Sequence, residues 1–151
     1  MSRAAHIEIR EVEKRFGDFQ ALRGVSLSIR KGEFLTLLGP SGSGKTTLLN
    51  LLAGFETVSA GAILKDGEDI AALPADRRNF GMVFQGYALF PHMSVADNVA
   101  FPLKARGMAR KARAERAQRM IEMVGLKGHE RKRPDALSGG QRQRVALARA
   151  L

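Results

Sequence analysis

The chain has no cysteine and no tryptophan, and only three histidines among its 151 residues. The absence of cysteine excludes disulfides and thiolate metal sites. No apolar run approaches the roughly 18 residues that a membrane-spanning helix needs, and residues 1–6 lack the apolar stretch of a secretory signal. Because 44% of the residues are apolar and 26% are charged, the chain can bury the core of one ordinary domain. These features are typical of a soluble cytoplasmic protein.

Acidic residues are scarce in one part of the chain. Between residues 103 and 133 there are eleven Lys or Arg and three Glu, which places eight of the ten net positive charges in this segment. A solvated helical face is one explanation, and a basic surface that faces phospholipid headgroups or a partner is another. Because no aromatic residue interleaves with these charges, we expect no nucleic-acid partner.

Hydrophobic periodicity predicts an α/β arrangement in the first half of the chain. A helix is expected over residues 45–53, with Leu48, Leu49, Leu51 and Leu52 on its buried side. Alternating or continuous apolar residues predict strands over 5–16, 25–31, 34–38, 61–69 (with a turn at Asp66-Gly67) and 80–85. The runs 34–38 and 80–85 are largely apolar, as in strands buried on both faces.

Beyond residue 85 the pattern becomes helical. Ser94 is expected to cap a helix with Asp97 as its capping-box partner, and Gly107 to end it. A basic helix is expected over 109–124, and a final helix over 142–151. The apolar face of the basic helix is expected to comprise Met120, Ile121, Met123 and Val124.

One glycine-rich segment matches the phosphate-loop pattern G-x-x-x-x-G-K-[ST]: Gly39, Pro40, Ser41, Gly42, Ser43, Gly44, Lys45 and Thr46. Glycines allow several backbone N–H groups to converge on a triphosphate, and the following helix adds its positive N-terminus. In such a loop Lys45 reaches the β- and γ-phosphates, and the Thr46 hydroxyl ligates Mg²⁺. Thr47 can donate to the α-phosphate. The sequence therefore predicts binding of ATP with Mg²⁺.

A second glycine motif follows about ninety residues later: Leu137, Ser138, Gly139, Gly140 and Gln141. At a helix start these residues offer a hydroxyl donor, open amides and the helix dipole, which together suit an anion. Taken alone, the motif is also explained by a capped helix start. Two such sites are needed when a nucleotide is sandwiched between two subunits.

With these motifs in order, the chain resembles the N-terminal two-thirds of an ABC-transporter ATP-binding subunit. The resemblance implies that Phe16 stacks on adenine, that Lys45 and Gln85 take part in catalysis, and that Gln85 touches Mg²⁺ and the attacking water. Residues 137–141 correspond to the signature that completes the partner's site. The implied fold is an α/β phosphate-loop NTPase core (about 1–85) with N-terminal antiparallel strands. An inserted helical subdomain (about 86–138) and the signature helix (139–151) follow, and the fold is expected to be incomplete at the C-terminus.

The stretch 84–93 (FQGYALFPHM) is similar to importers served by an extracytoplasmic solute-binding protein, especially those for spermidine and putrescine. Ferric-iron, sulfate and sugar importers carry close relatives of it. The resemblance implies a head-to-tail dimer with a second ATP-binding subunit, docked through residues near 85–110 on transmembrane permease subunits at the inner face of the membrane. The alternatives are a soluble ABC ATPase not linked to transport, a catalytically incomplete nucleotide-binding remnant, and a small-molecule kinase, in which residues 137–141 would have no role.

The family's Asp-Glu pair after the signature helix and its later switch histidine have no counterparts among these 151 residues. We therefore expect that residues 1–151 alone do not hydrolyse ATP.

Overall fold

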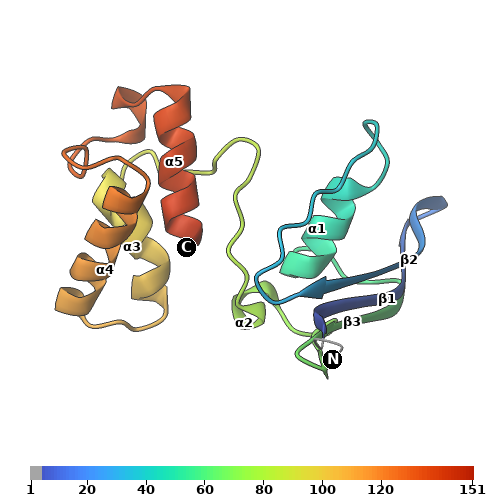
Figure 1. Cartoon of the computed structure of the whole chain (residues 1–151). Coiled ribbons are helices and arrows are strands. Elements are labelled where there is room, and N and C mark those ends of the chain that lie inside the picture. Colours follow the sequence, from blue (N-terminus) through green and yellow to red (C-terminus); the bar gives the residue numbers. More distant parts are fainter. Residues whose placement is uncertain (1–4) are drawn as a thin grey trace. The chain divides into compact units, whose positions relative to one another are not determined.

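The computed structural model describes residues 5–151, so residues 1–4 of the N-terminal stretch considered above lie outside the described residues. The chain falls into two units, residues 1–80 and residues 81–151 (Figure 1). The first unit holds strands and the phosphate-loop segment, and the second is helical. Each unit has its own hydrophobic core.

The first unit is built on a four-stranded antiparallel sheet. Strands β1 (Ala5–Phe16) and β2 (Phe19–Arg30) form a hairpin, and β3 (Ala60–Lys65) pairs with the other edge of β1. The short strand β4 (Glu68–Asp69) follows a turn at Asp66-Gly67, and the sheet order is β2-β1-β3-β4. The strand expected over 5–16 and the turn are confirmed. The second strand is also present, but it begins six residues earlier than expected and ends at Arg30, and the strand expected over 61–69 is divided into β3 and β4.

A β-bulge in β1 determines which of its side chains are buried. Ile7 and Ile9 are buried two residues apart, and the next buried residue is Val12, three residues further on. Glu11 has a φ of 44° in this interval, where the pairing register with β2 shifts. The extra residue at the bulge returns the strand to the same face. Lys14, two residues after Val12, is consequently buried as well.

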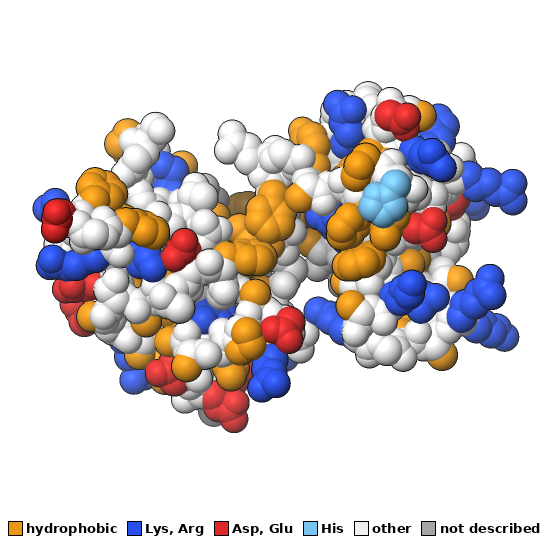
Figure 2. All heavy atoms as spheres, turned by 180° about the vertical axis from the view of Figure 1, so that it is seen from behind, with side chains coloured by type: hydrophobic (Ala, Val, Ile, Leu, Met, Phe, Trp, Pro, Cys, Tyr) orange, Lys and Arg blue, Asp and Glu red, His pale blue; other side chains and the backbone are white. Residues whose placement is uncertain are grey.

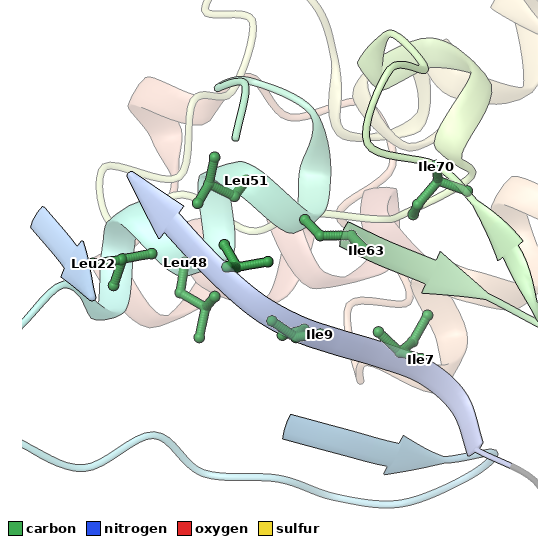
Figure 3. Close-up of a cluster of buried hydrophobic side chains, with 8 residues drawn as sticks. Ile7, Ile9, Leu22, Leu48, Leu51, Ile63 and Ile70 are labelled. Atoms are coloured by element: carbon green, nitrogen blue, oxygen red, sulfur yellow. The ribbon is translucent and has the colours of Figure 1, made fainter. Parts of the chain in front are cut away.

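Helix α1 (Lys45–Ala53) has the predicted bounds and packs against the sheet. Figure 3 shows Leu48 and Leu51 of this helix in one cluster with Ile9 of β1 and Ile63 of β3. The prediction that Leu49 is buried is wrong, because its side chain is 47% exposed. Residues 48, 51 and 52 follow the helical repeat along one face, and position 49 lies off that face. The unit also contains the single-turn helix α2 (Ala75–Arg78).

The two strands predicted to be buried on both faces are not formed. Residues 34–38 and 80–85 are assigned to no strand, and Phe34 and Leu38 are 93% and 89% exposed. A strand needs a neighbour to complete its hydrogen-bond ladder, and within residues 5–151 no strand pairs with either segment. Of the first run, Leu37 packs against the core.

The second unit comprises helices α3 (Val95–Ala105), α4 (Arg110–Met123) and α5 (Gly139–Ala150) and the 3₁₀ turn η1 (Pro134–Ala136). Its buried core consists of Val95, Val99, Ala117, Ile121, Leu126, Leu137, Val145 and Ala148. The Ser94 hydroxyl accepts the backbone N–H of Asp97 as predicted, and Gly107 follows the end of α3 with a φ of 75°.

Two expectations for this unit are wrong. Met123 is 68% exposed rather than part of the apolar face of α4, because that face turns with the helix through Ala117 and Ile121. The final helix begins at Gly139, three residues earlier than the helix that periodicity predicted over 142–151 and at the start of the signature helix that the resemblance implied. The glycines at 139 and 140 continue the helix because the cap at Ser138 fixes its first turn.

The positive charges of residues 103–133 lie at the surface of the second unit. Every Lys and Arg of this segment is exposed except Arg113, which is half-buried. Figure 2 shows Lys and Arg side chains spread over one face of this unit. Among residues 5–151, no helix has both the length and the apolar character needed to cross a membrane.

Candidate nucleotide-binding site

The phosphate loop leads directly into helix α1, and Gly44 makes the transition. Gly44 is the N-cap residue, with a φ of 86° in the left-handed region. A Cβ atom at this position would lie 2.6 Å from a methyl carbon of Leu22 and 2.9 Å from the carbonyl oxygen of Ala21. Strand β2 therefore packs directly against the loop, and only glycine fits at this position.

The Lys45 side chain folds back over the loop. Its ammonium donates to the carbonyl oxygens of Gly39 and Pro40 at 2.8 and 2.6 Å, and to the Ser43 hydroxyl at 3.0 Å. All three acceptors belong to the same eight-residue motif. The ammonium is thus held within the loop, where the phosphate oxygens of a ligand can replace the two carbonyl oxygens as its hydrogen-bond acceptors.

The first turn of α1 offers unpaired donors to an anion. The first hydrogen bond of the helix runs from the Leu48 N–H to the Gly44 carbonyl, so the amides of residues 45–47 precede the ladder. The turn contains no acidic residue and no side-chain cap. The helix dipole and these amides therefore favour a phosphate group here. Pro40, Ser41 and Gly42 are exposed at the rim of the loop.

The donor chemistry of the loop fits Mg²⁺ bound together with a nucleotide. Thr46 is exposed in the first turn of α1, and Mg²⁺ in phosphate sites takes one or two protein oxygens with several from substrate and water. Within residues 5–151 there is no cluster of three or more His, Asp or Glu that could hold a metal by itself. A metal at Thr46 would therefore depend on the phosphate oxygens.

Phe16, the predicted adenine-stacking residue, ends strand β1 with 45% of its surface exposed. The ammonium of Lys14 lies over its ring, 4.8 Å from the centroid. One face of the ring is therefore covered from within the protein, and the exposed part is available for stacking.

Gln85 lies in an exposed turn with Gly86 in the second unit. The two residues that follow, Tyr87 and Ala88, both have positive φ values, 63° and 47°. Arg149 of α5 donates to the carbonyl oxygens of both at 3.0 and 2.7 Å. The catalytic and Mg²⁺-binding roles of Gln85 stay predictions.

The signature segment forms a complete capping box at the start of α5. The Ser138 hydroxyl accepts the backbone N–H of Gln141 at 3.3 Å, and the Gln141 side chain accepts the backbone N–H of Ser138 at 2.9 Å. Gly139 and Gly140 lie in the first turn, and a Cβ at either would meet no atom within 4 Å. The amide of Gln141 also contacts the His129 ring nitrogen at 3.2 Å. The helix start is therefore fully capped, and the space around its two glycines is open.

Two positively charged side chains of the first unit are buried, and the sequence did not predict their burial. Lys14 is 7% exposed and Arg78 is 3% exposed. Arg78 donates to four carbonyl oxygens, of Leu51, Leu52, Ala71 and Leu73. Burial lowers the pKa of Arg78, and the neighbouring charge of Asp69 acts in the opposite direction. The bulge in β1, which only the structure shows, places Lys14 in the row of buried residues, and no local sequence pattern marks Arg78.

Comparison with known proteins identifies the class to which this arrangement belongs. The sequence model of the ABC transporter family matches residues 22–151. The chain therefore belongs to the ABC transporter family. It also resembles the ATP-binding cassette MJ0796, solved as a dimer in a post-hydrolysis state bound to ADP and Pi. The TM-score is 0.85 and the identity 34%, over 96% of this chain and 68% of that chain.

Curated relatives are similar over almost the whole chain. A spermidine/putrescine import ATP-binding protein of Nitrosomonas eutropha is 56% identical over 97% of the chain, and its counterpart in Thermotoga maritima is 50% identical over 96%. A sulfate/thiosulfate import ATP-binding protein of Chromobacterium violaceum is 54% identical over 97%. The chain spans about 40% of the length of these relatives.

Proposed function

We propose that the chain binds Mg²⁺–ATP through its phosphate loop, with residues 39–47 around the phosphates and Phe16 against the adenine. The observation that carries this proposal is the placement of the Lys45 ammonium within the loop, at the uncapped N-terminus of α1. Thr46 is the proposed protein ligand of Mg²⁺. The metal would neutralise charge on the phosphates, while Lys45 and the helix amides orient them.

We further propose that a protein in which this chain is joined to the family's Asp-Glu pair and switch histidine hydrolyses ATP as a head-to-tail dimer. Ser138, Gly139, Gly140 and Gln141 would cover the nucleotide held by the partner subunit, and Gln85 would orient the attacking water. The complete capping box and the open space around the two glycines of α5 support this role. So does the likeness to a cassette solved as a dimer. The division after residue 80 supports an α/β nucleotide-binding core followed by a helical subdomain and the signature helix.

As a biological role we propose the energy-coupling subunit of an importer, at the cytoplasmic face of the membrane with permease subunits. The polyamines spermidine and putrescine are the proposed cargo, delivered by an extracytoplasmic solute-binding protein. Several of the relatives are named for this substrate. Sulfate is the second candidate, because a relative named for sulfate/thiosulfate import is 54% identical.

Binding of Mg²⁺–ATP to purified protein, measured by calorimetry, tests the nucleotide site. Replacing Lys45 by Ala should weaken binding at least tenfold, because a charge-assisted contact to the phosphates is lost. Lys31→Ala, at an exposed position after β2, is the matched control and should leave the affinity unchanged. Equal affinity of the Lys45→Ala variant and the unchanged protein would contradict the proposal.

Uptake of labelled spermidine, putrescine and sulfate tests the biological role. Cells that carry Lys45→Ala in the chromosomal gene should lose uptake of the polyamines and keep uptake of sulfate. Loss of sulfate uptake alone would favour the second candidate. Retention of all three activities would argue for a soluble ATPase or a nucleotide-binding protein without a transport role.

A further inference from the structure

Lys14 is a charged residue in the interior of the first unit. Its side chain continues the row of buried residues on β1 that includes Val12, and it is 7% exposed. Burying an ammonium group is strongly unfavourable unless it finds partners. Two partners hold it: the Thr57 carbonyl oxygen at 2.8 Å and the Glu56 carboxylate at 2.9 Å.

The third neighbour of the Lys14 ammonium is the ring of Phe16, whose centroid lies 4.8 Å away. This is within the range of a cation–π interaction. The ammonium occupies one face of the ring, so a planar ligand can stack only on the opposite face. Because Thr57 and Glu56 hold the Lys14 ammonium in place, the Phe16 ring contacts a group whose position is fixed.

The partners of Lys14 connect two parts of the nucleotide site. Glu56 and Thr57 follow the C-terminal end of α1, and the N-terminus of that same helix carries the phosphate loop. Phe16 ends strand β1. Lys14 therefore joins the strand that presents the aromatic ring to the helix that presents the phosphate-binding amides.

We propose that Lys14 is a positioning residue for nucleotide binding: it holds the Phe16 ring as a preformed platform for the base and fixes it relative to α1. The proposal rests on the proposed function, since it needs a nucleotide base stacked on Phe16. A preformed ring loses less rotamer freedom when the ligand arrives. Lys14 therefore strengthens binding of the nucleoside part of ATP without contacting the phosphates.

Calorimetric titration of the whole protein with Mg²⁺–ATP and with Mg²⁺–tripolyphosphate, which has no base, tests this inference. Lys14→Met keeps an unbranched side chain, shorter by the terminal atom, and removes the ammonium group. It should weaken ATP binding about three- to tenfold, the range expected for one cation–π contact. Binding of tripolyphosphate should change less than twofold. Lys31→Met, at the exposed position after β2, is the matched control.

A double-mutant cycle with Phe16→Ala separates positioning from a merely structural role. In the Phe16→Ala background, Lys14→Met should have no further effect on ATP binding, because the ring through which Lys14 acts is absent. An equal loss in both backgrounds, or an equal loss for ATP and tripolyphosphate, would overturn the proposal. Unchanged ATP affinity in Lys14→Met would also overturn it.

Two further measurements keep the test decisive if Lys14→Met fails to fold. Glu56→Gln removes the ion pair and retains Lys14 and Thr57, so it should weaken ATP binding in the same selective way. The chain has no tryptophan, so Phe16→Trp supplies a single tryptophan at the platform, which can be excited selectively beside Tyr87. Adding Glu56→Gln to it should increase quenching by acrylamide, and no increase would count against an anchored ring.

The failure of this proposal is distinguishable from failure of the proposed function. If Lys45→Ala abolishes ATP binding while the Lys14 and Glu56 variants bind normally, the site exists and Lys14 does not position the ring. If the unchanged protein binds no ATP, or binds it independently of Lys45, the proposed function itself is wrong and the inference about Lys14 is overturned with it.

Discussion

Arg149 donates to the main-chain carbonyl oxygen of Ala88 at 2.7 Å, and so joins helix α5 to the segment that follows Gln85. A second bond from the same guanidinium reaches the Tyr87 carbonyl at 3.0 Å. Both acceptor residues have positive φ values, a conformation that costs roughly 1–2 kcal/mol for a residue with a side chain. Burial lowers the pKa of Arg149. The helix that begins at the signature motif therefore holds a strained turn next to Gln85 in place.

Replacing Arg149 by Met should release this turn. We expect a loss of about 2 kcal/mol in the free energy of unfolding, the scale of charge-assisted hydrogen bonds to a partly buried group. Hydrogen exchange should rise most at residues 87–90, because their carbonyl anchors are gone. Arg119→Met, at an exposed position on α4, is the control. Equal effects of the two variants in urea denaturation and in hydrogen exchange would contradict the prediction.

Arg78 has a comparable role in the first unit, at the end of α1 opposite the phosphate loop. Its guanidinium donates to the Leu51 and Leu52 carbonyls and to the chain before α2 at Ala71 and Leu73. Arg78→Met would leave these buried oxygens without their donor, so we expect a destabilisation of about 3 kcal/mol. The neighbouring exposed residue Arg77 provides the control variant Arg77→Met, for which urea denaturation should show a change below about 0.5 kcal/mol. A loss of that small size for Arg78→Met would show that water replaces the guanidinium.

The elements that the sequence predicted well are those fixed by local chemistry. Helix α1 follows from a phosphate loop and a leucine-rich run, and the start of α3 follows from a serine whose hydroxyl caps Asp97. The phosphate loop was likewise predictable, because glycine spacing and Lys45 are features of the sequence itself. The roles of Phe16, Gln85 and the signature residues rest on resemblance and stay predictions.

The failures concern features that depend on distant partners. The apolar runs at 34–38 and 80–85 carry a strand pattern, yet a ladder requires a neighbouring strand, which the sheet of residues 5–80 does not offer them. The burial of Lys14 depends on a bulge and on acceptors 42 and 43 positions away. That of Arg78 depends on carbonyls that only the folded chain brings together. Hydrophobic periodicity does not indicate which strands pair, where a bulge forms or which distant carbonyls approach a side chain.

Glu130 gives the second unit a pH-dependent contribution to stability. Its carboxylate accepts the backbone N–H of Gly128 at 3.0 Å and the side-chain amide of Gln118 at 3.2 Å. The bond from Gly128 is the main reason why the pKa of Glu130 lies below its ordinary value, with further lowering from its own backbone N–H, Gln118 and His129. A lowered pKa in the folded state means that the contribution is present above the unfolded pKa, about 4.3, and is lost as pH falls through the folded value.

The variant Glu130→Gln tests this linkage. It should be less stable than the unchanged protein at pH 7, and the difference should shrink as the pH falls below about 4. Urea denaturation at several pH values, with the carboxyl followed by NMR, measures both quantities. A stability difference that is the same at pH 7 and pH 3, or a carboxyl that titrates at or above its ordinary pKa, would contradict the prediction.

Two glycines of the first unit allow the cost of a close backbone approach to be measured separately from the cost of backbone conformation. Gly61 and Gly67 have almost the same φ, 86° and 87°. A Cβ at Gly61 would collide with the carbonyl oxygen of Glu11, at the bulge of β1, whereas a Cβ at Gly67 would meet nothing within 4 Å. Alanine at either position incurs the cost of a positive φ, about 1 kcal/mol. Only alanine at 61 also forces strands β1 and β3 apart.

We therefore expect Gly61→Ala to destabilise the protein by about 2 kcal/mol more than Gly67→Ala, as forced repacking of a tight contact does. Thermal and urea denaturation of the two variants give the difference directly, because the shared conformational cost cancels. If the two variants lose the same stability, β3 can move away from the bulge without loss, and the row of buried residues on β1 does not depend on the close approach at Gly61. If Gly61→Ala weakens ATP binding and Gly67→Ala does not, the bulge that turns Lys14 inward is also needed to hold the Phe16 ring in position for the base.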